Sequence, residues 1–270
     1  FYKEVGHSQE GAKEVVSLFG DKGVFDGPKP VRLLQRLITL ANLGDNSIVL
    51  DFFSGSASTA HALMKMNAEK DKSCKFILVQ LPEEVNDKKK NVGYSTICEI
   101  GKERIRRAGK KIKEELAVKQ QESGLFIKQE EKQILDTGFR VLKLDNSNME
   151  DIYYSPTEYN QNDLFSKTES VKSDRTSEDL LFQVMLELGA TLDSKIEQIG
   201  IKGKTIYNVA TNYLVACFDN EIDGSVVTAI AKMQPQYAVF RDSSMADDST
   251  ATNFEQIFKT YSPNTVTKVL

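Results

Sequence analysis

The spacing of apolar and polar residues changes along the first 81 residues, and each change marks a predicted element. Apolar residues spaced for one helix face follow a Pro-Lys-Pro sequence at residues 28–30, and proline suits the first turn of a helix. An apolar run at residues 47–53 then predicts a strand, and residues 57–67 predict a helix. Residues 75–81 predict a second strand, buried on both faces as in a parallel sheet. This order is typical of one strand–helix–strand crossover unit.

The rest of the chain predicts a long helix and then a second group of helices and strands. A helix is predicted at residues 95–119, and residues 138–144 alternate like a half-buried strand. Residues 146–175 are rich in Asn, Asp, Ser, Tyr and Thr, which favours an irregular connection with a domain boundary inside it. After a helix start at Thr176 the pattern predicts strands at 205–210 and 213–218 joined as a hairpin, a helix at 224–233, a strand at 237–241, a helix at 253–261 and a strand at 265–270.

The predicted fold class is therefore α/β, with a domain at residues 1–145, a connection at 146–175 and a smaller α/β domain at 176–270. A chain of 270 residues has room for one large domain or two small ones. Its 40% apolar and 27% charged residues are ordinary for a globular protein. No apolar run approaches the roughly 20 residues that a membrane helix needs, so we expect no membrane span.

Cysteine, histidine and net charge narrow the function classes. Cys74, Cys98 and Cys217 are far apart and odd in number, so a disulfide framework or a zinc knuckle is not expected and a reducing cytoplasm fits best. With only His7 and His61, no histidine-rich metal site is predicted. The net charge of −4 argues against strong non-specific affinity for nucleic acid, although one face can still be basic.

The stretch at residues 51–59, Asp-Phe-Phe-Ser-Gly-Ser-Ala-Ser-Thr, carries the strongest chemical signal. A strand that ends in an acidic residue, turns through small residues and enters a helix is typical of a nucleotide-cofactor site, because backbone N–H groups can approach a ligand there. Gly55 is the turn's one glycine, so it lacks the three-glycine pattern for a dinucleotide, and no phosphate-binding P-loop occurs elsewhere. The sequence therefore favours a ligand without phosphates, such as S-adenosylmethionine.

Three further side chains have roles in this interpretation, and each has a simpler alternative. Lys29 can pair with a ligand carboxylate, or it is merely solvated. Phe52 or Phe53 can lie against an adenine ring or a sulfonium cation, although one of the two is expected only to pack. Gln80, at the end of the second predicted strand, can hydrogen-bond ribose hydroxyls, or it simply ends the strand.

The predicted helix at residues 95–119 carries many basic side chains. They are expected mostly away from its apolar face: Lys102, Arg104, Arg106, Arg107, Lys110, Lys111 and Lys113. One interpretation is a solvated surface, and the other is contact with DNA phosphates. Under the second, the predicted DNA-binding residues are Lys102, Arg106, Arg107 and Lys110.

Several of these stretches resemble one enzyme family. Residues 25–30 resemble motif X of amino-group DNA methyltransferases, and residues 51–59 resemble their motif I, usually Asp-x-Phe-x-Gly-Ser-Gly-Thr-Thr. Residues 75–83 and 100–107 are similar to the modification (Mod) subunit of type III restriction–modification systems, and so are residues 138–145, 174–181 and 239–248. The resemblance implies the C-terminal part of an adenine-specific DNA methyltransferase of the β-class motif order, with a partial Rossmann-like domain that binds S-adenosylmethionine. The implied cofactor-binding residues are Phe25, Asp26, Lys29, Asp51, Phe53, Ser54, Gly55, Ser56 and Gln80.

Two departures from the family pattern qualify this expectation. Ala57 stands where the family has its second glycine, and alanine resists the positive φ that glycine allows, so the loop is expected to be reshaped. The Asp-Pro-Pro-Tyr type tetrapeptide, which positions the target amine in this family, is absent. In the β-class order it precedes motif X, so we expect the chain to be the C-terminal part of a longer protein, inactive alone and without catalytic or metal-binding residues of its own.

The resemblance also implies partners. They are double-stranded DNA, bound through the intact protein, and a second Mod copy or a restriction (Res) subunit, which residues 176–270 would dock. Two alternatives stay open, a pure assembly module and a small-molecule methyltransferase, although the latter would rarely place a Pro-Lys-Pro helix directly before the cofactor loop.

Overall fold

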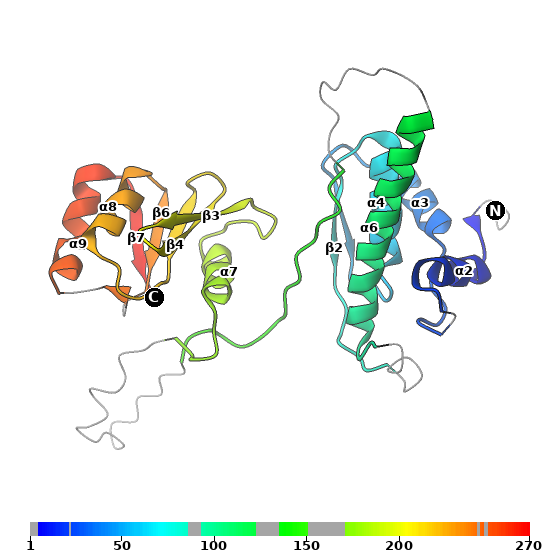
Figure 1. Cartoon of the computed structure of the whole chain (residues 1–270), viewed down its shortest axis with the longest axis horizontal. Helices are drawn as coiled ribbons and strands as arrows, with labels where there is room; N and C mark the ends of the chain where they lie inside the picture. The colour runs from blue at the N-terminus through cyan, green and yellow to red at the C-terminus, as the bar shows by residue number, and fades with distance from the viewer. Residues whose placement is uncertain are drawn as a thin grey trace. The chain divides into compact units, whose positions relative to one another are not determined.

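The computed structural model describes residues 5–21, 23–85, 93–122, 135–150, 171–241, 244–245 and 248–270. The chain divides into two compact units, Phe1–Val141 and Leu142–Leu270 (Figure 1). Each unit combines helices with strands, so the predicted α/β class is confirmed.

The first unit is a short parallel sheet with helices packed on it. Its elements are α2 (Ser8–Phe19), α3 (Val31–Leu40), β1 (Ile48–Asp51), α4 (Ser58–Lys70), β2 (Lys75–Leu78) and α6 (Ile97–Glu122). The strands β1 and β2 are parallel, with Asp51 opposite Leu78, so the predicted strand–helix–strand order is confirmed. The helix α2 was not predicted, because its buried face is narrow and consists of Gly11 and Val15.

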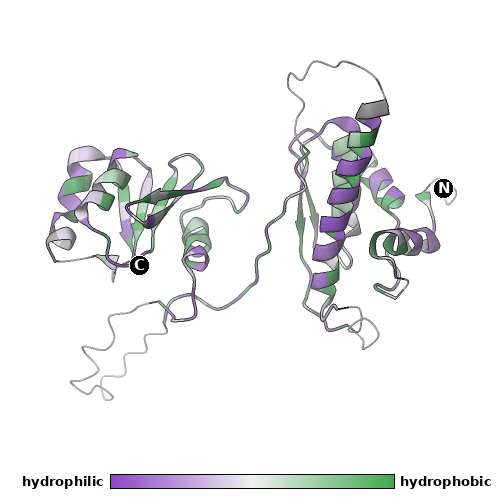
Figure 2. Cartoon of the chain, viewed as in Figure 1, coloured by the Kyte–Doolittle hydropathy of each residue, from purple (hydrophilic) through white to green (hydrophobic). Residues whose placement is uncertain are grey.

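Among the described residues, helices cover one face of this sheet and leave the other exposed. Val49, Phe76 and Leu78 point toward α3, α4 and α6, where two apolar clusters join strands and helices. On the opposite face Ile48, Leu50 and Ile77 expose 57%, 58% and 50% of their surface, and Val79 continues that row with 50%. The prediction that residues 75–81 are buried on both faces is therefore wrong. We call Ile48, Leu50, Ile77 and Val79 the apolar outer face; the sheet's apolar residues appear green in Figure 2.

The strand predicted at residues 138–144 does not form. These residues pair with no strand in the described part of the chain, and Phe139 instead packs on the cluster between α4 and α6. Gly109 of α6 allows this approach, because a Cβ there would lie 2.8 Å from the Cβ of Thr137. Val141, Leu142 and Leu144 are exposed, so Phe139 is the one apolar residue of this stretch that packs on the helices described.

The second unit is built on a mixed sheet in the order β3-β4-β5-β6-β7. Its elements are α7 (Ser177–Glu187), β3 (Ile196–Ile201), β4 (Lys204–Val209), β5 (Leu214–Cys217), α8 (Gly224–Lys232), β6 (Tyr237–Phe240), α9 (Asp248–Tyr261) and β7 (Val266–Val269). The strands β3, β4 and β5 are antiparallel, which confirms the predicted hairpin, and β5, β6 and β7 are parallel. One core joins the sheet to α7 and a second joins it to α8 and α9.

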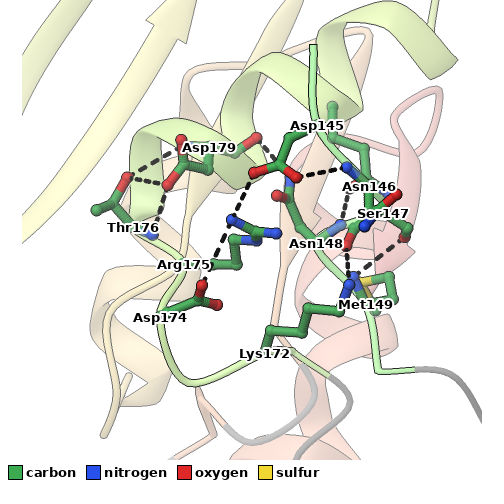
Figure 3. Close-up of polar contacts among 11 residues, drawn as sticks. Asp145, Asn146, Ser147, Asn148, Met149, Lys172, Asp174, Arg175, Thr176 and Asp179 are labelled. Carbon is green, nitrogen blue, oxygen red and sulfur yellow. Dashed lines mark hydrogen bonds and ion pairs between the residues drawn. The ribbon is translucent and has the colours of Figure 1, made fainter. Parts of the chain in front are cut away.

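The start of α7 is held by a group of polar contacts (Figure 3). Thr176 and Asp179 form a capping box, in which each side chain accepts a hydrogen bond from the backbone N–H of the other. Arg175 pairs with Asp145 at 3.1 Å, and Lys172 donates to the carbonyl of Ser147 at 2.8 Å. These contacts join residues 145–149 to residues 171–179 within the second unit.

No helix in the described ranges is long and apolar enough to cross a membrane. Cys74, Cys98 and Cys217 are all free thiols. Within the same ranges no three His, Cys, Asp or Glu side chains come together in a way that could hold a metal ion. The boundaries predicted at residues 145 and 175 stay predictions.

Candidate cofactor site

The loop between β1 and α4 has a fixed local conformation. Both oxygens of the Asp51 carboxylate accept hydrogen bonds, Oδ1 from the Phe53 N–H at 3.2 Å and Oδ2 from the Thr59 hydroxyl at 2.6 Å. Gly55 has φ +51° and Ala57 has φ +59°, so two residues of the loop are left-handed. Alanine thus adopts the conformation that it resists, at the position where the family has glycine.

Two other segments meet this loop. The side-chain oxygen of Gln80, just beyond β2, accepts a hydrogen bond from the Gly55 N–H at 2.8 Å. Phe25 lies on another side, because a Cβ added to Gly55 would be 3.2 Å from the Phe25 Cζ. Phe25, Gly55 and Gln80 are therefore brought together from three parts of the sequence.

The remaining predicted cofactor residues differ in exposure. Phe53 exposes 82% of its surface and its ring centroid lies 5.2 Å from that of Phe52. Asp26 and Lys29 are exposed as well, whereas Ser54 is half-buried and Ser56 is buried. An exposed aromatic side chain next to a tight loop is available to a planar ligand. Cofactor contact by these residues stays a prediction.

Arg104 is not on a solvated face. Its residue is 0% exposed, and Nη1 donates to the hydroxyls of Ser56 at 2.8 Å and Ser58 at 2.6 Å. Burial lowers the pKa of Arg104 to about 10, which still leaves it charged at neutral pH. The sequence contains a signal for this position, because Ile100, Arg104 and Ala108 are spaced by four residues and share the buried side of α6.

Glu14 of α2 contacts both Arg104 and the start of α3. Its carboxylate accepts the Val31 N–H at 3.0 and 3.2 Å, which satisfies an unpaired donor at the start of α3. The same carboxylate lies 3.6 Å from the Arg104 Nη2. Burial raises the pKa of Glu14, while the Val31 N–H and Arg104 act in the opposite direction. The two segments that resemble motifs X and I are therefore connected through Glu14 and Arg104.

A cavity of about 310 Å³ lies between α2, α4 and α6. Of the described residues that line it, none belongs to the nine predicted cofactor contacts. His61 lines it, and its Nδ1 has no hydrogen-bond partner in the described part of the chain. Burial, and after it the charges of Arg104, Lys65 and Lys111, lower the pKa of His61 to about 3. A neutral, half-buried imidazole fits a structural histidine.

Arg107, one of the predicted DNA contacts, joins α6 to α2. Its Nε lies 2.6 Å from a Glu103 carboxylate oxygen, and its Nη1 donates to the Leu18 carbonyl at 3.1 Å. The guanidinium also lies 4.8 Å from the centre of the Phe19 ring. These contacts give Arg107 a structural role of its own.

The other predicted DNA contacts are held less tightly by neighbouring side chains than Arg107 is. Lys110 and Arg106 are exposed, with carboxylates at 3.9 Å (Glu114) and 3.6 Å (Glu103). Ion pairs this exposed contribute little to stability, so phosphates can compete for these side chains. Lys102 is half-buried. The structure tests none of these DNA contacts, and they remain predictions.

One known protein family matches most of the first unit. Residues 2–110 match the family described as DNA methylase (N6_N4_Mtase), a range that contains every element from α2 to β2 and the first half of α6.

Three similar proteins are modification (Mod) subunits. The chain is 44% identical over 115 residues to the Mod subunit of the type III restriction-modification enzyme StyLTI of Salmonella typhimurium, which covers 42% of this chain and 17% of that protein. It is 41% identical over 114 residues to the EcoPI Mod subunit of Escherichia phage P1 (41% and 17%) and 44% identical over 89 residues to the EcoP15I Mod subunit of Escherichia coli (32% and 14%). The resemblance to type III Mod subunits is therefore confirmed, over less than a fifth of the length of these relatives.

Proposed function

We propose that the first unit is the S-adenosylmethionine-binding part of a Rossmann-like DNA methyltransferase domain. In the intact protein it would support transfer of a methyl group to the exocyclic amine of adenine, in DNA whose target base is flipped out of the duplex. The sequence holds no Asp-Pro-Pro-Tyr type tetrapeptide, so the residues that position that amine would come from elsewhere in the intact protein. The similarity to DNA methylases favours this function over a small-molecule methyltransferase.

The observation that carries the proposal is the loop after β1, where Phe25 and Gln80 contact a left-handed Gly55 and Asp51 holds the Phe53 N–H and the Thr59 hydroxyl. A side chain on Gly55 would press on Phe25, so the missing Cβ lets the Phe25 ring lie close to the loop backbone. The charges there suit S-adenosylmethionine better than a phosphate. Residues 51–59 include a carboxylate and no basic side chain, and the nearby Arg104 is occupied by two serine hydroxyls.

The chemistry of each predicted contact fits a part of this cofactor. Asp51 and Gln80 offer acceptors and donors for ribose hydroxyls, because a carboxylate oxygen can accept more than one hydrogen bond. Phe53 and Phe25 offer aromatic faces for adenine or the sulfonium. Lys29 offers a cation to the carboxylate, and Asp26 can accept from the amino group. The bound cofactor supplies an activated methyl group, and the protein's part is to hold it in position.

Calorimetry with S-adenosylmethionine on the intact protein tests this proposal. We expect Asp51→Ala to abolish measurable binding, because it removes the acceptor and releases both the Phe53 N–H and the Thr59 hydroxyl. Asp45→Ala is the matched control, since Asp45 is an exposed carboxylate of the same unit whose cation partner is 3.9 Å away. Affinity unchanged by Asp51→Ala would refute the assignment.

For the second unit we infer a role in assembly, with a second Mod copy or a Res subunit as the partner. It has its own two cores, and its edge strand β7 leaves Val266 and Val269 exposed. An exposed edge strand with apolar side chains is a ready surface for another chain. Light scattering after size-exclusion chromatography tests this, with Val266→Lys expected to shift an oligomer toward a monomer. A wild-type protein that is monomeric and does not bind a Res subunit would remove the idea.

A further inference from the structure

The cofactor loop contains backbone strain that other residues must hold. Within three residues, Gly55 has φ +51° and Ala57 has φ +59°. A left-handed alanine is unfavourable, and such residues persist only when their surroundings fix them. Ala57 is also the N-cap residue of α4, and its side chain makes no capping hydrogen bond. Capping therefore does not stabilise the loop.

Helix α6 supplies the restraint. Arg104 Nη1 donates to Ser56 Oγ at 2.8 Å and to Ser58 Oγ at 2.6 Å, one residue on each side of Ala57. All three side chains are buried, so water does not compete for these hydrogen bonds. Hydrogen bonds from a charged donor are stronger than those between neutral groups, and here one nitrogen fixes two points of the loop.

The backbone of α6 comes close enough for this contact because of Gly101. A Cβ at that position would lie 3.3 Å from the Gly55 carbonyl oxygen and 3.6 Å from the Ala57 Cβ. Arg104 follows three residues later on the same side of α6, so its side chain reaches Ser58 in the first turn of α4.

The charge of Arg104 is balanced by a carboxylate of α2. Its Nη2 lies 3.6 Å from Glu14, whose carboxylate also accepts the Val31 N–H. The guanidinium is therefore the centre of a chain of contacts from the start of α3 to the start of α4. The segment at residues 28–31 and the loop at residues 54–58 cannot move independently while this chain is intact.

We propose that Arg104 is a positioning residue. It holds residues 56–58 in their strained conformation and, through Glu14, keeps the start of α3 in place beside them. The identity of the ligand that benefits rests on the proposed function, but the hold on the loop does not.

Hydrogen exchange followed by mass spectrometry measures that hold directly. In Arg104→Met and Arg104→Lys we expect the amides of residues 54–60 to exchange about tenfold faster or more, the effect of losing hydrogen bonds to a charged donor. Lys111→Met is the matched control, because Lys111 is another basic residue of α6 that donates to a serine hydroxyl, that of Ser17 on α2 at 3.2 Å. It should leave the loop amides unchanged. Equal exchange in wild type and Arg104→Lys would overturn the proposal.

A double-mutant cycle keeps the test decisive if Arg104→Met does not fold. Ser56→Ala and Ser58→Ala each remove one acceptor and change little volume, and each should speed exchange of the loop amides severalfold. In the Arg104→Lys background their further effect should shrink, because the partner is already altered. Full additivity of the two changes would show that Arg104 does not act through the serines.

Cofactor affinity separates positioning from a merely structural role. For folded Arg104→Lys we expect the Kd for S-adenosylmethionine to rise about tenfold or more, in parallel with loop exchange, with no rise for Lys111→Met. Faster loop exchange with an unchanged Kd would refute positioning. If the wild-type protein binds no S-adenosylmethionine, the proposed function fails, while the exchange data still decide whether Arg104 holds the loop.

Discussion

Acidification should destabilise the first unit through His61. The half-buried imidazole lies between α2, α4 and α6, and its pKa falls from 6.5 to about 3, with desolvation as the main cause. The unfolded chain takes up a proton on His61 below pH 6.5, but the folded protein does not until about pH 3. The free energy of unfolding therefore falls as the pH drops through this window and is unaffected by His61 above it.

The size of the effect follows from the two pKa values. A pH of 5 is 1.5 units below the ordinary His61 pKa of 6.5, so the side chain is protonated in the unfolded chain while it is still neutral in the folded one. At about 1.4 kcal/mol per unit this costs the folded state roughly 2 kcal/mol between pH 7 and pH 5. Glu14, which lines the same cavity and has a raised pKa, contributes in the opposite direction, so the comparison must isolate His61.

The comparison is wild type against His61→Gln, which keeps a polar side chain of similar size and does not titrate. The buried thiols report on each unit separately, Cys74 on the first and Cys217 on the second. Labelling of each thiol in increasing urea, read by mass spectrometry, gives the free energy of opening of each unit at each pH. Intrinsic thiol reactivity cancels because both proteins are compared at the same pH.

We expect the wild-type protein to lose roughly 2 kcal/mol more than His61→Gln at the Cys74 thiol between pH 7 and pH 5. At Cys217 the two proteins should behave alike. His7→Gln, which removes an exposed histidine, should follow the wild type. Equal losses in wild type and His61→Gln at Cys74 would show that burial does not keep His61 neutral.

Two further predictions use the same labelling. Gly55→Ala should destabilise the first unit by about 1–2 kcal/mol, because φ is +51° and the new Cβ would lie 3.2 Å from Phe25. Gly20→Ala, also at positive φ but with nothing within 4 Å, should cost less, and equal costs would remove the contact from the explanation. Thr176→Ala should cost the second unit about 1 kcal/mol, since it breaks the capping box with Asp179. An unchanged second unit would show that the box adds no stability.

The parts predicted correctly have local signals. The strand β1, the helix α4 and the strand β2 follow from apolar runs separated by small or polar turn residues, and Thr176 marks the start of α7 through its own side chain. The loop at residues 54–57 was found for the same reason, because its composition is unusual over a short stretch.

The parts predicted wrongly depend on distant contacts. Residues 138–144 alternate like a strand, but a strand needs a partner, and alternation does not say whether one exists. Residues 75–81 were expected to be buried on both faces, and whether a sheet face is covered depends on segments far apart along the chain. Arg104 was placed in solvent by its residue type, although its spacing from Ile100 and Ala108 puts it in the core.

The apolar outer face has a practical consequence for anyone who produces this polypeptide. Four aliphatic side chains from two neighbouring strands are exposed on one face of a parallel sheet. Sheets of this type are normally covered on both faces. Such a surface binds hydrophobic dyes and favours precipitation as the concentration rises. Mild detergent should therefore raise the soluble yield more than a change of salt.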